Sequence, residues 1–174
     1  MTHLKTRLTK VLQRAERIAV LAVGSRLRGD DAAGLLAADE LAKAVKSAKQ
    51  RGRLAIFLGE TAPENLTGPI RQFNPTHLIV IDAADMGQRP GSIAIIEPGA
   101  TGANASFCTH ALPINILTDY LRDSTGCRAT IIGIQPATRE FGREPSSSVR
   151  SAAIQLSALI AAAVQANEAR GPAS

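Results

Sequence analysis

The chain has 174 residues, of which 45% are hydrophobic, 20% charged and only 3% aromatic, with Trp absent. This length and composition are typical of one globular domain with an aliphatic core, and no uninterrupted apolar stretch reaches the roughly 18 residues of a membrane span. The formal net charge is +5, but the 20 basic residues are scattered among 15 acidic ones without interleaved aromatics, which disfavours nucleic-acid binding.

The opening segment HLKTRLTKVLQRAER is the densest basic part of the chain and has the period of a helix. Its apolar stripe consists of Leu4, Leu8, Val11, Leu12 and Ala15. We therefore expect a basic N-terminal helix over 1–16, docked on a single-domain core of about 17–167, with a frayed tail over 168–174. The start lacks an export signal and the two cysteines lack CxxC spacing, so we expect a cytoplasmic protein with reduced thiols.

Short apolar runs bounded by charge, glycine or proline predict the strands, which cover residues 17–24, 53–59, 76–84, 92–98 and 129–136. Helical periods and start signals predict the helices between them, over residues 31–50, 61–73, 113–126 and 146–169. The turn over 86–91 is too short for a helical crossover, so the third and fourth strands are not a regular parallel pair. The pattern predicts a three-layer α/β/α sandwich with a five-stranded, mostly parallel mixed sheet.

Two adjacent carboxylates, Asp30 and Asp31, follow the first strand, and Asp82 ends the third. Ligands of such sheets bind beyond the carboxyl ends of the strands, where these acids are expected to lie together. The structural interpretation has Asp30 capping the following helix and Asp31 complementing its dipole. Nucleotide binding is disfavoured, because the glycine-punctuated turn has neither GxGxxG nor the lysine of a P-loop.

A third interpretation of these acids is a metal site of Asp31, Asp82 and His110, the histidine in the small polar segment 99–112. Mixed oxygen and nitrogen ligands suit nickel or zinc, and an open coordination position suits metal-assisted hydrolysis. Spacing alone leaves the structural and metal-binding interpretations of Asp31 and His110 both open.

Five motifs, spread in order over Val23 to Pro136, carry a family resemblance: VGSRLRGDDAAG, TAPENLTGPIR, HLIVIDAADMGQRPGSI, SFCTHALP and GIQP. In this order they resemble the hydrogenase maturation endopeptidases, particularly those of the hydrogenase-3 type. The resemblance implies a nickel-dependent, aspartic-type endopeptidase that removes the C-terminal extension of a [NiFe]-hydrogenase large-subunit precursor after nickel insertion. It also implies a phosphorylase/hydrolase-like sheet with one antiparallel strand.

The resemblance further implies that Asp31, Asp82 and His110 contact nickel delivered by the substrate, with Asp31 and Asp82 as the catalytic acids. Hydrolysis would use Lewis-acid polarisation of the scissile carbonyl or water activation by an aspartate. The residues that frame the substrate are expected to be Ser25, Glu60, Glu64 and Asn65.

Two positions depart from the family pattern. Ser25 stands where the family usually has asparagine, and Leu58 stands where many members have an acid. Glu60 is the nearby acid that would substitute for it. The expected partner is the nickel-loaded precursor, and the alternatives are a non-enzymatic nickel-sensing, chaperone-like module and a free-standing metallo-amidohydrolase.

Overall fold

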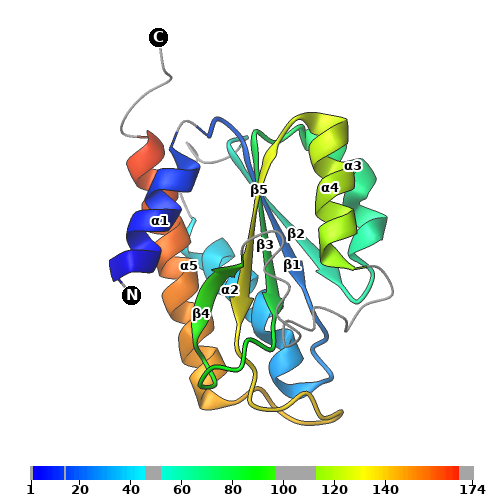
Figure 1. The fold of residues 1–174 in the computed structure, drawn as a ribbon, viewed down its shortest axis with the longest axis vertical. Coiled ribbons are helices and arrows are strands. Elements are labelled where there is room, and N and C mark those ends of the chain that lie inside the picture. The colour runs from blue at the N-terminus through cyan, green and yellow to red at the C-terminus, as the bar shows by residue number, and fades with distance from the viewer. Residues whose placement is uncertain (1, 14, 46–51, 97–112, 169–174) are drawn as a thin grey trace.

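The computed structural model describes residues 2–13, 15–45, 52–96 and 113–168 (Figure 1). Within these residues, five strands form one sheet in the order β2-β1-β3-β5-β4. The strands are β1 (Ile18–Val23), β2 (Leu54–Glu60), β3 (His77–Ala83), β4 (Ile93–Ile96) and β5 (Arg128–Ile134). All neighbouring pairs are parallel except β4 with β5, so the prediction of a mixed sheet with one antiparallel strand is confirmed.

Helices cover both faces of the sheet, as predicted. They are α1 (Thr2–Leu12), α2 (Ala33–Ala44), α3 (Thr67–Phe73), α4 (Ile114–Thr125) and α5 (Ser147–Glu168), with 3-10 turns η1 (Gly29–Ala32) and η3 (Pro63–Leu66). Figure 1 shows α1, α2 and α5 on one face and α3 and α4 on the other. The three-layer α/β/α prediction is therefore confirmed, while the division into core and frayed tail stays a prediction.

Alternation along the central strand β3 divides the core in two. Ile79 and Ile81 belong to the cluster with α1, α2 and α5, whereas Leu78 and Val80 belong to the cluster with α3 and α4. Because successive side chains point to opposite faces, Asp82 extends the α3–α4 side. All seven residues of β3 are buried, which explains why this strand reads as an almost continuous apolar run.

The N-terminal helix α1 packs as its apolar stripe predicts. Leu8 and Leu12 are fully buried in the cluster that also contains α5, and Leu4 is 8% exposed. Lysine and arginine side chains occupy the other face of α1, where residues 5 and 10 are exposed. This helix adds an apolar layer over α5.

The long helix α5 is apolar enough, by length and composition, to cross a membrane. Over Ser147–Asn167 its mean hydropathy is 1.4, yet half of that stretch is buried inside the fold. Val149, Leu156 and Ile160 are fully buried in the core cluster shared with α1 and α2. The packing of a core helix accounts for the composition of α5.

Helix α2 starts in direct contact with the carboxyl ends of two strands. A Cβ atom on Gly34 would overlap the carbonyl oxygens of Val23 and Ile81, at the ends of β1 and β3. Only glycine lets the first turn of α2 approach the sheet this closely. The same contact brings the preceding residues, including Asp31, to the sheet edge.

Candidate active site

Asp31 is positioned by a tight turn after β1. The Gly24 amide donates to the Glu60 carbonyl oxygen across 3.0 Å, and Gly24 adopts φ +135°, a region that favours glycine. A Cβ atom at Gly24 would overlap the Asp31 carbonyl oxygen. The turn therefore folds back on itself and places Asp31, 1% exposed, inside η1 at the carboxyl edge of the sheet.

Asp82 lies at the same edge, near the end of β3, and is also 1% exposed. Its Oδ1 accepts a hydrogen bond from the Ala83 amide across 2.8 Å. The neighbouring position on β5 is Gly133, where an added Cβ atom would lie only 2.8 Å from the Ala84 side chain. The strands are thus packed tightly around Asp82, and a carboxylate in such a place needs polar partners.

Arg139, in the loop between β5 and α5, contacts both parts of this edge. Its Nη2 donates to the Ala83 carbonyl oxygen across 2.8 Å, and its Nε lies 3.9 Å from Oδ1 of Asp31. The Arg139 side chain is 22% exposed, so this positive charge is largely enclosed. It connects Asp31 to the residue that follows Asp82, and no motif in the sequence near Arg139 indicates this role.

Asp30 performs a different structural task from the one predicted. No side chain caps η1 or α2; instead the fully buried Asp30 carboxylate binds the loop between β5 and α5. It accepts hydrogen bonds from the amides of Ala137 (2.7 Å), Thr138 (3.3 Å) and Ser146 (2.6 Å), and from the Ser146 hydroxyl (2.9 Å). The prediction that Asp30 caps its own helix is wrong, because these distant donors satisfy the carboxylate first.

Gln135, at the end of β5, organises the turn after β3. Its Oε1 accepts from the amides of Met86 (2.6 Å) and Gln88 (3.2 Å), and its Nε2 donates to Oδ1 of Asp85 across 3.1 Å. The hydrogen bond from Gln135, followed by that from the Gly87 amide, lowers the pKa of Asp85. The GIQP motif therefore holds a second loop of the site edge in place.

The residues expected to frame the substrate follow β1 and β2. Ser25 is half-buried, and its hydroxyl accepts from the Leu27 amide across 3.3 Å. Glu60 is exposed at the end of β2 with φ +47°, and its carbonyl oxygen holds Gly24. These two residues adjoin the turn that carries Asp31.

Glu64 and Asn65 lie one turn further along, in η3. Asn65 is exposed, whereas Oε2 of Glu64 is enclosed and has no hydrogen-bond partner among the described residues. Leu58, the departure from the family pattern, is 44% exposed in the edge strand β2. His110 lies outside the described residues. Within the described ranges, no three His, Cys, Asp or Glu side chains are grouped to hold a metal ion.

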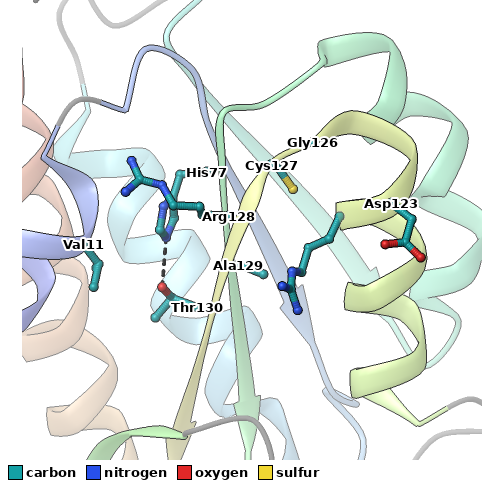
Figure 2. A pocket seen from close by; sticks show the side chains of 9 residues that line it. Val11, His77, Asp123, Gly126, Cys127, Arg128, Ala129 and Thr130 are labelled. Atoms are coloured by element: carbon teal, nitrogen blue, oxygen red, sulfur yellow. Dashed lines mark hydrogen bonds between the residues drawn. The ribbon is translucent and has the colours of Figure 1, made fainter.

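A cavity of about 530 Å³ lies at the opposite edge of the sheet, where β3 and β5 begin. Figure 2 shows His77 beside Thr130 on one side of β5, and Cys127 and Asp123 on the other. Nε2 of His77 lies 2.9 Å from the Thr130 hydroxyl. Burial, with a smaller contribution from the Arg128 charge, lowers the pKa of His77 to about 4. This cavity is separate from the acid edge.

The structure is an α/β/α sandwich with two buried acids at the carboxyl edge of its sheet, the edge at which enzymes of this architecture bind their ligands. A family model for hydrogenase maturation proteases matches residues 37–164, a span that contains Asp82 and His110 and begins after Asp31. The chain belongs to the hydrogenase maturation protease family and is an endopeptidase.

Relatives agree with this assignment. The chain is 40% identical to the hydrogenase 3 maturation protease of Escherichia coli K12 over 117 residues, which cover 67% of this chain and 71% of that protein. It is 30% identical to a putative hydrogenase maturation protease of Methanocaldococcus jannaschii over 141 residues, or 79% and 83% of the two chains. The crystal structure of the protease HycI from Thermococcus kodakarensis matches with a TM-score of 0.81 at 31% identity, covering 91% and 99%.

Proposed function

We propose that this endopeptidase removes the C-terminal extension of a [NiFe]-hydrogenase large-subunit precursor after nickel has been inserted. The observation that carries the proposal is the pair of buried acids, Asp31 and Asp82, at one sheet edge in a chain of this family. Nickel dependence and a cytoplasmic location are part of the proposal.

In this proposal nickel arrives as part of the substrate, held by the precursor's own thiolates. Asp31, Asp82 and His110 contact the ion, so that only a loaded precursor is held in register for cleavage. Carboxylate oxygens and an imidazole nitrogen form a donor set that nickel accepts. Ser25 follows β1, Glu60 ends β2, and Glu64 and Asn65 lie in η3 shortly after it. We place these four residues beside the path of the tail.

Two hydrolytic chemistries suit these residues. One of the aspartates deprotonates the attacking water as a general base, or the ion polarises the scissile carbonyl while the aspartates orient the peptide. Arg139 serves either route, because its positive charge lies 3.9 Å from Asp31 and offsets part of the cost of burying that carboxylate.

The test is incubation of the purified protein with nickel-loaded and nickel-free precursor, followed by mass spectrometry of the precursor's C-terminus. We expect cleavage of the loaded form alone. Asp82→Asn and His110→Ala should each abolish cleavage. Asp39→Asn, which alters a surface acid paired with Arg26, should leave it intact.

Four outcomes would contradict the proposal. Processing of the nickel-free precursor at the same rate as the nickel-loaded one would show that cleavage does not depend on nickel. Tight binding of the loaded precursor without turnover would favour a chaperone-like module, and firm nickel binding by the isolated protein with hydrolysis of small amides would favour a metallo-amidohydrolase. Cleavage by Asp82→Asn at the wild-type rate would remove that acid from the site.

A further inference from the structure

Two large apolar side chains project into solvent from the loops beside the acids. Leu27, between β1 and η1, is 63% exposed, and Phe141, between β5 and α5, is 74% exposed. The Gly142 amide donates to the Leu27 carbonyl oxygen across 2.8 Å, so the two loops lie side by side at these positions. We call these two residues the Leu27–Phe141 rim.

The loops that carry this rim are fastened to each other. Besides the hydrogen bond from Gly142 to Leu27, two more backbone hydrogen bonds join the loops. The Gly29 amide donates to the Arg143 carbonyl oxygen across 3.0 Å, and the Asp30 amide donates to the Thr138 carbonyl oxygen across 2.9 Å. The buried Asp30 carboxylate also accepts hydrogen bonds from the amides of Ala137, Thr138 and Ser146. Exposed apolar side chains on a preorganised loop bind a partner with little further loss of conformational entropy.

The rim is continuous with the site edge. Leu27 lies four residues before Asp31, and Phe141 lies two residues after Arg139. The two loops that contribute Asp31 and Arg139 to the site therefore also present Leu27 and Phe141 to solvent. Figure 1 shows the loop between β5 and α5 running past the carboxyl ends of the parallel strands. A protein whose tail reaches Asp31 passes next to this rim.

The charge beside the rim is positive and unneutralised. Arg28 is exposed and forms no ion pair with any residue in the described part of the chain. Its neighbours differ, because Arg26 is paired with Asp39 across 2.8 Å and Arg143 with Glu140 across 3.0 Å. An apolar contact flanked by a free guanidinium favours a partner in which a bulky apolar side chain neighbours a carboxylate.

We propose that the Leu27–Phe141 rim docks the body of the large-subunit precursor, through an apolar side chain next to an acidic residue that meets Arg28. The inference rests on the proposed function and adds where the precursor is held while its tail is cleaved. Aromatic side chains and arginine are enriched at protein interfaces, and a few such anchors carry most of the affinity, which gives Phe141 and Arg28 the larger expected share here.

The experiment compares the double variant Leu27→Ser/Phe141→Ser with Ile154→Ser, a matched control on the outer face of α5 whose side chain is 55% exposed. The probe is the purified, nickel-loaded precursor of a hydrogenase-3-type large subunit. We expect the double variant to raise KM and the precursor Kd at least tenfold with kcat within about twofold, since the acids are untouched. Ile154→Ser should match the wild type, and Phe141→Leu should retain most of the affinity.

A second variant tests the charge. Arg28→Glu should weaken precursor binding several-fold in dilute buffer. The difference in Kd between this variant and the wild type should shrink in about 0.5 M salt, because salt screens exposed charges. An unchanged Kd for the double variant would overturn the docking inference even if cleavage is normal. Conversely, a wild-type protein that binds the precursor through this rim without cleaving it would overturn the proposed function alone. Concentration-dependent dimers that the double variant abolishes would assign the rim to a second copy instead.

Discussion

At the scale of single residues, Arg139 contacts the surroundings of both buried acids, Asp31 and Asp82. It binds the Ala83 carbonyl oxygen and stands 3.9 Å from Asp31, both at the carboxyl edge. A largely enclosed positive charge offsets part of the cost of burying two carboxylates. We therefore predict that Arg139 is a positioning residue for Asp31.

Replacing Arg139 should therefore impair cleavage without removing a catalytic group. For Arg139→Gln we expect kcat to fall about tenfold or more, equivalent to about 1.4 kcal/mol, with a smaller change in KM. Arg139→Lys should recover part of the rate, because it restores the charge without the fork of donors. Steady-state processing of the loaded precursor measures both constants.

The control for Arg139 is Arg143→Gln on the same loop, whose side chain is 69% exposed and pairs with the surface residue Glu140. It should behave as the wild type, since exposed ion pairs contribute little. Equal kinetic losses in the two variants would show that the loop, rather than the Arg139 contacts, is responsible.

Local sequence pattern predicted some of these residues and missed others for a physical reason. Asp31 and Asp82 follow predicted strands, so the topology of a parallel sheet alone places them at one edge. Arg139 and Asp30 act through partners far away in the chain, and nothing near them in the sequence identifies those partners. Asp30 looked like a helix cap because a carboxylate before a helix normally is one.

At the scale of elements, the contact between α2 and the sheet depends on Gly34. Gly34→Ala should destabilise the protein by about 3 kcal/mol or more, at the upper end for overpacking, because a Cβ atom would overlap two backbone carbonyls that cannot move independently of their strands. It should also reduce cleavage, since α2 follows directly from the turn that carries Asp31. Denaturant-induced unfolding measures the first effect and precursor processing the second.

A second helical glycine provides the comparison. A Cβ atom added to Gly68 in α3 would meet open space, so Gly68→Ala should be neutral or stabilise the fold by up to about 1 kcal/mol. If Gly34→Ala proved equally harmless, α2 would not be held against the strands as described.

Most helices and strands are predictable from the sequence, because each has a regular apolar pattern and is bounded by charged residues, glycine or proline. The five strands, their mixed pairing and the four later helices were expected in this order. The start of α2 differs by two residues from its expected position, since residues 29–32 wind as the tighter 3-10 turn η1 before α2 begins at Ala33. Periodicity does not distinguish the two helix types over one turn.

At the scale of the whole molecule, His77 makes stability depend on pH. The folded protein holds its pKa at about 4, below the value of 6.5 expected when exposed. Between these two values the unfolded chain takes up a proton that the folded chain does not, so stability falls as the pH falls through this window. The loss from this group reaches about 3 kcal/mol near pH 4, and it is absent above pH 7.

The variant His77→Gln should reduce the pH dependence of the unfolding free energy in this window, while keeping a side chain that can form a hydrogen bond with Thr130. Free energies of unfolding from denaturant titrations between pH 4 and 7.5 give the comparison. A wild-type curve that runs parallel to that of His77→Gln would show that His77 is not the responsible group.

The two ends of β3 thus have separate properties. Its rise of about 3.3 Å per residue puts His77 roughly 16 Å from Asp82, with a solid aliphatic core in between. An engineer could therefore raise the tolerance of this protease to mildly acidic buffers at the first residue of the strand and leave the acid proposed to act in cleavage, at the sixth, undisturbed.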